Sequence, residues 1–286
     1  MDDLFWIALG LTTIAGISTG IGGIIGVISK RTNTKFLAAA LGLSAGVMIY
    51  ISFMEMMPLS IDAFNKVYNN NPALNGPPPE LWTVLSFFGG IFIIMLIDFL
   101  VPAMKNPHEI KTEEDFVDIE LEPRDQGVGG HLKRKSTKSL LKTGIVTAIV
   151  VALHNFPEGM VTFISTMESV KVGIGIAIAI AIHNIPEGIA IATPLYYSTG
   201  NKKQGFLMAL IAGLAAPIGG LIGYFLLKEI MGIYMLGMTY GLVSGIMVYI
   251  SLDELLPTAE KYGHHHWSMI GLVFGFAIMA TTMLIF

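Results

Sequence analysis

Two long apolar stretches, each interrupted by the same kind of six-residue motif, decide the fold of this chain. The first is TGIVTAIVVALHNFPEGMVTFISTM at Thr143–Met167, and the second is VGIGIAIAIAIHNIPEGIAIATPLYYSTGN at Val172–Asn201. Each is long enough for a helix to cross a bilayer, which takes about 20 mostly apolar residues. The stretches therefore predict two membrane-spanning helices, and the short connection between them makes the helices antiparallel.

Six more stretches are free of charged residues and long enough to cross a membrane. They are Leu4–Ser29, Phe36–Met54, Leu81–Ile97, Gln204–Leu227, Ile230–Leu252 and Trp267–Phe286. We therefore predict an all-α integral membrane protein with eight transmembrane helices, located in the cell membrane. The acidic start Met1-Asp2-Asp3 lacks the basic segment of a cleaved signal peptide, so the first stretch is expected to remain as a span.

The composition agrees with a membrane protein. Hydrophobic residues make up 53% of the chain and charged residues 13%, whereas about 25% of the residues of a soluble domain are charged. This excludes an ordinary soluble enzyme and a disordered chain. The formal net charge of −4 argues against a nucleic-acid partner, and the absence of cysteine excludes thiolate metal sites.

The chain, predicted as a single transmembrane domain over residues 1–286, contains an internal repeat. IAGISTGIGGIIG at 14–26 is similar to IAGLAAPIGGLIG at 211–223, at an offset of 197. GVMIYISFMEMMP at 46–58 is similar to GIMVYISLDELLP at 245–257, at an offset of 199. The related spans run in opposite directions, and such inverted-topology repeats are typical of secondary transporters.

This repeat predicts a three–two–three arrangement of the spans. The chain then divides into four parts: repeat A at 4–101, a cytoplasmic linker at 102–141, the two central spans at 142–198 and repeat B at 204–286. Basic residues gather in the loops on the cytoplasmic side of membrane proteins. If both termini lie outside, only Lys66, Lys171 and Lys228 of the 17 basic residues fall on the outer side. We therefore predict that both termini are outside.

The two central motifs carry the candidate metal ligands. His154-Asn155-Phe156-Pro157-Glu158-Gly159 and His183-Asn184-Ile185-Pro186-Glu187-Gly188 both lie near the middle of their spans. His and Glu at i and i+4 share a helix face, and ionisable groups at this depth are normally functional. Facing one another, the motifs supply two imidazoles, two carboxylates and two amide oxygens.

This donor set suits a divalent first-row metal or cadmium, namely Zn²⁺, Fe²⁺, Mn²⁺ or Cd²⁺. Two carboxylates also nearly neutralise one dication in a medium of low dielectric. The ligands suffice for two adjacent ions. An alternative that the residues alone leave open is an intramembrane metal-dependent hydrolase, because similar ligands build hydrolytic centres.

The paired motifs, the eight spans and the long loop after the third span resemble the ZIP (Zrt-, Irt-like protein) family of divalent metal transporters, in its bacterial ZupT-like branch. The resemblance extends over essentially the whole chain. It implies uptake of Zn²⁺ and similar cations, including iron, into the cytoplasm as cargo rather than cofactor, through a binuclear site. By motif position the ligands would be His154, Asn155, Glu158, His183, Asn184 and Glu187. It also implies an elevator-like motion of spans 1, 4, 5 and 6 against the others.

Three acidic residues at the ends of repeat-related spans are weaker candidates. Glu55 is placed toward the outside of the second span and is predicted to be an accessory ligand on the uptake side. Asp253 and Glu254, placed toward the inside of the seventh, are predicted to relay the ion on release. Solvated interfacial carboxylates are the alternative for all three. The expected partners are divalent ions and the lipid bilayer, and a homodimer is a common state for such folds.

Overall fold

The structure, a computed structural model, describes residues 3–28, 34–70, 76–100, 130–230 and 233–285. Its elements in this part of the chain are all helical. They are α1 (Asp3–Ile28), α2 (Thr34–Ile51), the π-helical turn η1 (Ser52–Met56), α3 (Met57–Asn70), α4 (Pro79–Leu100), α6 (Gly130–Glu168), α7 (Val170–Thr199), α8 (Lys202–Ile230), α9 (Ile233–Ile250), the π-helical turn η2 (Ser251–Leu255), α10 (Leu256–Lys261) and α11 (His265–Ile285). The predicted all-α class is confirmed.

Eight helical stretches among the described residues are long and apolar enough to cross a membrane, which confirms the predicted number of spans. The second and seventh are longer than predicted: they run over Thr34–Asn69 and Tyr234–Glu260. The second helical stretch continues past Glu55 and the seventh past Asp253 and Glu254, the carboxylates before which the predicted spans end. In both, a π-helical turn carries the backbone through these residues.

The two π-helical turns occupy repeat-related positions and have a common cause. Pro58 and Pro257 follow η1 and η2 at the same spacing. Proline lacks an N–H and clashes with the carbonyl four residues earlier in an α-helix, and a wider turn relieves this clash. The amides of Met57 and Leu256 close the turns onto the carbonyls of Ser52 and Ser251.

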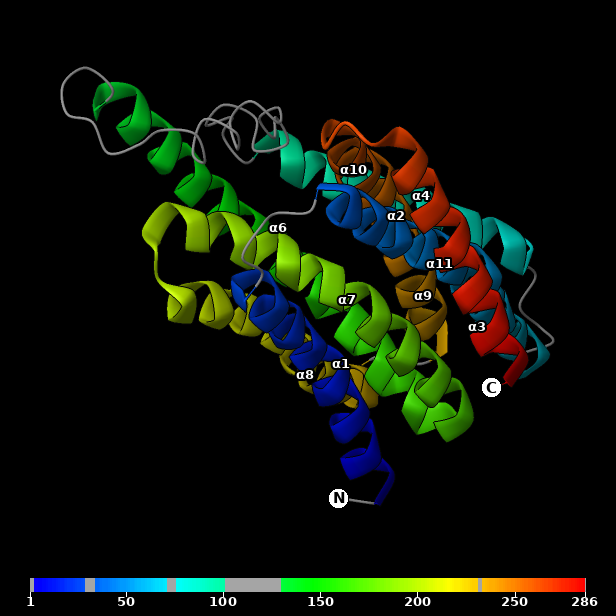
Figure 1. Cartoon of the computed structure of the whole chain (residues 1–286). Coiled ribbons are helices and arrows are strands. Elements are labelled where there is room, and N and C mark those ends of the chain that lie inside the picture. The colour runs from blue at the N-terminus through cyan, green and yellow to red at the C-terminus, as the bar shows by residue number, and fades with distance from the viewer. Residues whose placement is uncertain (1–2, 29–33, 71–75, 101–129, 231–232, 286) are drawn as a thin grey trace.

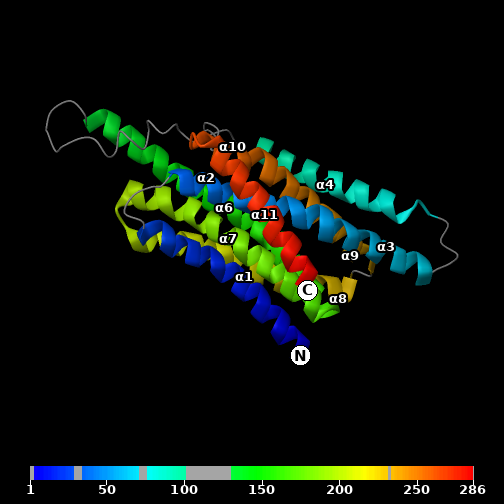
Figure 2. The ribbon, with the colours of Figure 1, turned by 45° about the vertical axis from the view of Figure 1, so that its right-hand side comes forward.

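The helices form two groups that lie side by side in both views (Figures 1 and 2). The hexapeptide group consists of α1, α6, α7 and α8, which pack closely on one another. In the flanking group, α2 packs along α11, and α9 packs along α4 and α3. The two groups meet mainly where α2 faces α7 and α6 faces α9.

Glycines bring the helices of the hexapeptide group into close contact at repeat-related positions. A Cβ at Gly22 of α1 would overlap the carbonyl oxygen of Ile185, and a Cβ at Gly219 of α8 would overlap that of Phe156. In return, Gly188 lies against the carbonyl of Thr19, and Gly159 against that of Ala216. The helix pairs α1–α7 and α8–α6 therefore use equivalent contacts, and the motif glycines permit this close approach.

Local features of the backbone mark the two ends of α7. Ser169 caps α7, since its side chain accepts from the amide of Val172, and Gly200 ends α7 in the left-handed conformation at φ 69°. The starting end of α1 and the final end of α11 lie at the same end of the bundle (Figures 1 and 2). Helix α6 begins at Gly130, so residues 130–141 of the predicted linker are helical, while residues 102–129 lie outside the described part of the chain.

Candidate metal centre

The structure places all six predicted ligands in the middle of the hexapeptide group. His154, Asn155 and Glu158 belong to α6, and the equivalent three residues belong to α7. None of the six is more than 2% exposed. Pro157 and Pro186 lie inside continuous helices, so each motif presents its side chains from a helical backbone.

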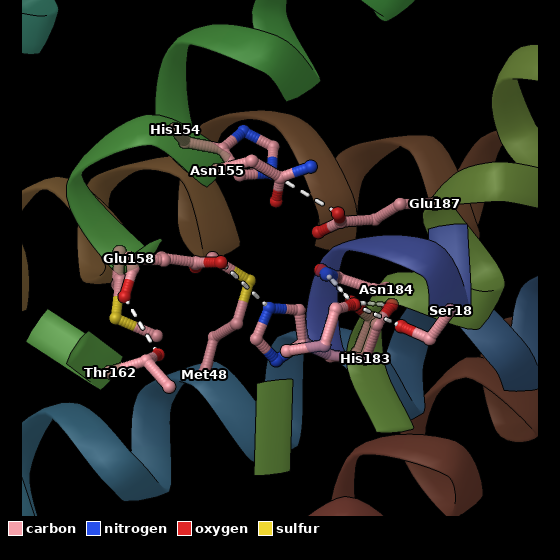
Figure 3. Close-up of polar contacts among 12 residues, drawn as sticks. Ser18, Met48, His154, Asn155, Glu158, Thr162, His183, Asn184 and Glu187 are labelled. Atoms are coloured by element: carbon pink, nitrogen blue, oxygen red, sulfur yellow. Dashed lines mark hydrogen bonds and ion pairs between the residues drawn. The ribbon is translucent and has the colours of Figure 1, made fainter. Parts of the chain in front are cut away.

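The histidines and glutamates pair between the two motifs. His154 Nε2 lies 3.2 Å from Glu187 Oε2, and His183 Nε2 lies 3.3 Å from Glu158 Oε2. Figure 3 shows both pairs spanning the space between α6 and α7. The sequence places each His on the same helix face as the Glu of its own motif, and the structure turns both faces toward the partner helix. Each imidazole consequently meets the carboxylate of the other motif.

The two asparagines each connect their helix to a repeat helix. Asn155 Nδ2 donates to the carbonyl oxygen of Ala212 in α8 at 3.2 Å, and Asn184 Nδ2 donates to that of Ala15 in α1 at 2.9 Å. Ala15 and Ala212 are separated by the offset of 197 seen in the sequence repeat. The amide nitrogens therefore fix the orientation of both side chains, which leaves their oxygens directed elsewhere.

Unpartnered polar atoms are concentrated in these motifs. Eight buried side-chain nitrogen or oxygen atoms among the described residues have no hydrogen-bond partner, and six of them belong to the two motifs. They are His154 Nδ1, Asn155 Oδ1, Glu158 Oε1, His183 Nδ1, Asn184 Oδ1 and Glu187 Oε1. Buried polar atoms nearly always have partners, so such a group calls for an unplaced water or ion. Each motif contributes one nitrogen and two oxygens of the types that bind first-row divalent cations.

The ligands are nevertheless not gathered around one point. Among the described residues, no three His, Asp or Glu side chains are close enough to hold a metal ion together. The two cross-helix pairs instead use one nitrogen of each imidazole and one oxygen of each carboxylate.

Two residues of α2 that the sequence analysis did not select also reach this region. Met48 is fully buried, and its side chain points into the cluster in Figure 3. Ser44 Oγ donates to the carbonyl oxygen of His183 at 3.3 Å. Ser44 and Met48 are four residues apart in α2, which places them on one helix face.

The three accessory carboxylates lie in the π-helical turns, at repeat-related positions. Glu55 belongs to η1 and is partly buried. In η2, Asp253 is exposed, whereas Glu254 is partly buried. Of the two carboxylates of η2, Glu254 is therefore the more shielded one, and Asp253 lies at the surface.

Comparison with known proteins assigns the family. The model described as ZIP Zinc transporter matches residues 3–283. A protein named zinc transporter ZupT from Clostridium perfringens (strain 13 / Type A) is 47% identical over 277 residues, covering 96% of this chain and 94% of its own. Proteins of the same name from Chlorobaculum parvum (strain DSM 263 / NCIMB 8327) and Streptococcus mutans serotype c (strain ATCC 700610 / UA159) are 45% and 46% identical, with both chains fully covered.

These findings confirm the resemblance seen in the motifs and decide between the two functional classes that the residues left open. The family consists of transporters and not of enzymes, so the intramembrane hydrolase is excluded. Together with the eight spans, the similarity identifies a multi-pass protein of the cell membrane that transports divalent metal ions. The chain belongs to the ZIP zinc transporter family.

Proposed function

We propose that this protein carries Zn²⁺ from outside into the cytoplasm through a binuclear site formed by the two hexapeptide motifs. The six proposed ligands are His154, Asn155, Glu158, His183, Asn184 and Glu187. The observation that carries the proposal is the concentration of unpartnered buried donor atoms in these residues. The relatives named zinc transporters support zinc as the first ion to test.

The donor chemistry leaves Fe²⁺, Mn²⁺ and Cd²⁺ as further cargo. These ions accept imidazole and carboxylate ligands as zinc does, and they differ chiefly in preferred geometry. The two motifs offer equal sets of donors, which supports two adjacent ions that share the glutamates. A shell of nitrogen and oxygen ligands also suits a transporter, since the cargo must be released.

Movement of the hexapeptide group against the flanking group would provide alternating access. The dense packing within each group and the narrower contact between them support an elevator-type motion. The equivalent contacts of α1 with α7 and of α8 with α6 support the inverted repeat in its three–two–three arrangement. The distribution of basic residues between the loops supports both termini outside. In this scheme Glu55 assists uptake, and Glu254 with Asp253 assists release into the cytoplasm. We propose a homodimer as the transporting unit, a state common for such folds.

Metal flux into sealed proteoliposomes tests the proposal. Purified protein is reconstituted, and the initial rates of Zn²⁺, Fe²⁺, Mn²⁺ and Cd²⁺ uptake are compared between wild type and Glu187→Gln. Glu168→Gln is the matched control, because Glu168 is an exposed carboxylate at the end of α6, away from the cluster.

We expect saturable Zn²⁺ uptake in wild type and Glu168→Gln, and uptake at the level of empty vesicles in Glu187→Gln. Replacing the carboxylate by an amide keeps the shape but removes the charge that balances the cation. Glu187→Gln protein that is folded and takes up zinc at the wild-type rate would refute the site assignment.

A further inference from the structure

Hydrogen bonds connect the two helix groups near the cluster. Tyr240 Oη of α9 lies 2.9 Å from Ser165 Oγ of α6, and neither residue is more than 1% exposed. Ser44 Oγ of α2 reaches the carbonyl oxygen of His183 in α7 at 3.3 Å. The first of these bonds joins two side chains, so it can be removed without changing the backbone.

Neither bond can form at the repeat-related positions. The offset of 199 relates Tyr240 to Leu41, and the spacing of 29 between the motifs relates Ser165 to Pro194. The same offset relates Ser44 to Val243. Leucine, proline and valine side chains can neither donate nor accept a hydrogen bond. The ion-binding motifs are thus matched, whereas neither of these hydrogen bonds between the groups has a counterpart at the repeat-related positions.

This asymmetry matters for a transporter built from inverted repeats. In such proteins the two access states arise from rocking or gating of one bundle against the other, around a site at the repeat interface. The contacts that close one side have their counterparts at the repeat-related positions on the other side. A bond with no counterpart therefore stabilises one state and not the other, and shifts the population toward that state.

We propose that Tyr240 and Ser165 form a one-sided latch, which holds the hexapeptide group against the flanking group in the arrangement described here. The latch makes this arrangement the favoured state in the absence of ions, and Ser44 adds to the same preference. The inference rests on the proposed function, because a latch requires two groups that move past one another.

Cysteine accessibility tests the latch directly, since the chain contains no cysteine of its own. Ile176 of α7 is 1% exposed and lies in a core that includes Leu41 and Met48 of α2. An Ile176→Cys reporter is labelled with a membrane-impermeant maleimide in lipid nanodiscs, where both faces of the protein meet the reagent. Tyr240→Phe and Ser165→Ala are then added separately and together, and Ile180→Cys serves as a second reporter in the same core.

Thr166→Val is the matched control for loss of a buried hydroxyl. Thr166 follows Ser165 in α6 and is fully buried, but its hydroxyl donates to the carbonyl of Thr162 within the same helix at 2.7 Å. The substitution nearly preserves the shape of the side chain and leaves the contact between the groups intact. The labelling rate should therefore equal that of the reporter alone.

We expect Tyr240→Phe and Ser165→Ala each to raise the labelling rate about fivefold, as loss of one hydrogen bond between neutral groups shifts the population. The double variant should match the single ones, because all three remove the same bond. Labelling rates within twofold of the reporter alone at both reporter positions would overturn the latch. Labelling needs neither ions nor transport, so that result would leave the uptake experiment unaffected, and zinc uptake by Glu187→Gln would refute the site independently.

Discussion

The two motif-bearing helices, α6 and α7, are alike at the centre of the molecule and different beyond it. Each donates an asparagine amide to a repeat helix, places a glutamate against the histidine of the other, and leaves one nitrogen and two oxygens without partners. Beyond the motif, α6 carries Thr162, Ser165 and Thr166, where α7 carries Ile191, Pro194 and Leu195. The comparison suggests that matched residues determine ion binding, and that unmatched residues determine which access state is preferred.

The largest expected effect tests the equivalence of the two carboxylates. Glu158→Gln and Glu187→Gln should each reduce the initial rate of zinc uptake in proteoliposomes to the background of empty vesicles, because each removes half of the charge that balances the cation. If one of the two variants keeps most of its zinc uptake and the other loses it, the two carboxylates are not equivalent.

Ion binding should also be visible as stabilisation of the purified protein. An ion that binds only the folded state at 100 times its Kd stabilises it by about 2.7 kcal/mol. We expect Zn²⁺ to raise the melting temperature of wild type, and to leave that of His183→Ala/Glu187→Gln unchanged. The measurement is thermal unfolding in detergent, with and without the ion. An equal zinc-induced shift in the double variant would place binding elsewhere in the chain.

The two motif glycines provide a structural test of the same equivalence. Gly159→Ala and Gly188→Ala should each lower the free energy of unfolding by about 1–3 kcal/mol, the usual cost of overpacking. A Cβ at either position would overlap a carbonyl oxygen of the facing helix. Gly10→Ala is the control, since a Cβ there meets no atom within 4 Å. Stability at the wild-type level in both variants would show that the helices do not pack this closely.

The smallest effects are expected at the π-helical turns. Glu55→Gln and Glu254→Gln should each lower zinc uptake by on the order of a few-fold, because each removes one attracting charge beside the route and no proposed ligand. Zinc-induced stabilisation should stay as in wild type. If either variant loses that stabilisation, its carboxylate belongs to the binding site and the division between ligands and accessory residues is wrong.

Much of the fold follows from local features of the sequence. The apolar stretches give the number of spans, and the repeated hexapeptide gives residues that the structure does bring together. The ends of the second and seventh spans were wrong, since Glu55 and Asp253 suggested a membrane surface where the helix in fact continues through a π-helical turn. Pro58 and Pro257, which follow the two turns, were the available signal. Hydrophobicity alone does not predict that a helix continues past such residues.

The pairing of each histidine with the glutamate of the other motif could not be predicted from the sequence alone. Spacing along the helix joins His154 with Glu158, whereas the structure joins His154 with Glu187, because the relative position of α6 and α7 depends on glycine contacts with α1 and α8. The bond between Tyr240 and Ser165 joins residues 75 positions apart, and neither residue stands out in its own span. Contacts that depend on the packing of several helices leave little trace in any one segment.

We propose above that the unpartnered atoms of both motifs bind the transported ion. X-ray absorption at the zinc edge of the purified, zinc-loaded protein tests this most directly, with zinc content measured on the same samples. We predict a shell of nitrogen and oxygen ligands with imidazole scattering in wild type, and loss of both the imidazole signal and the retained zinc in His154→Ala/His183→Ala. Unchanged zinc content and an unchanged spectrum in that variant would show that the ion is bound elsewhere.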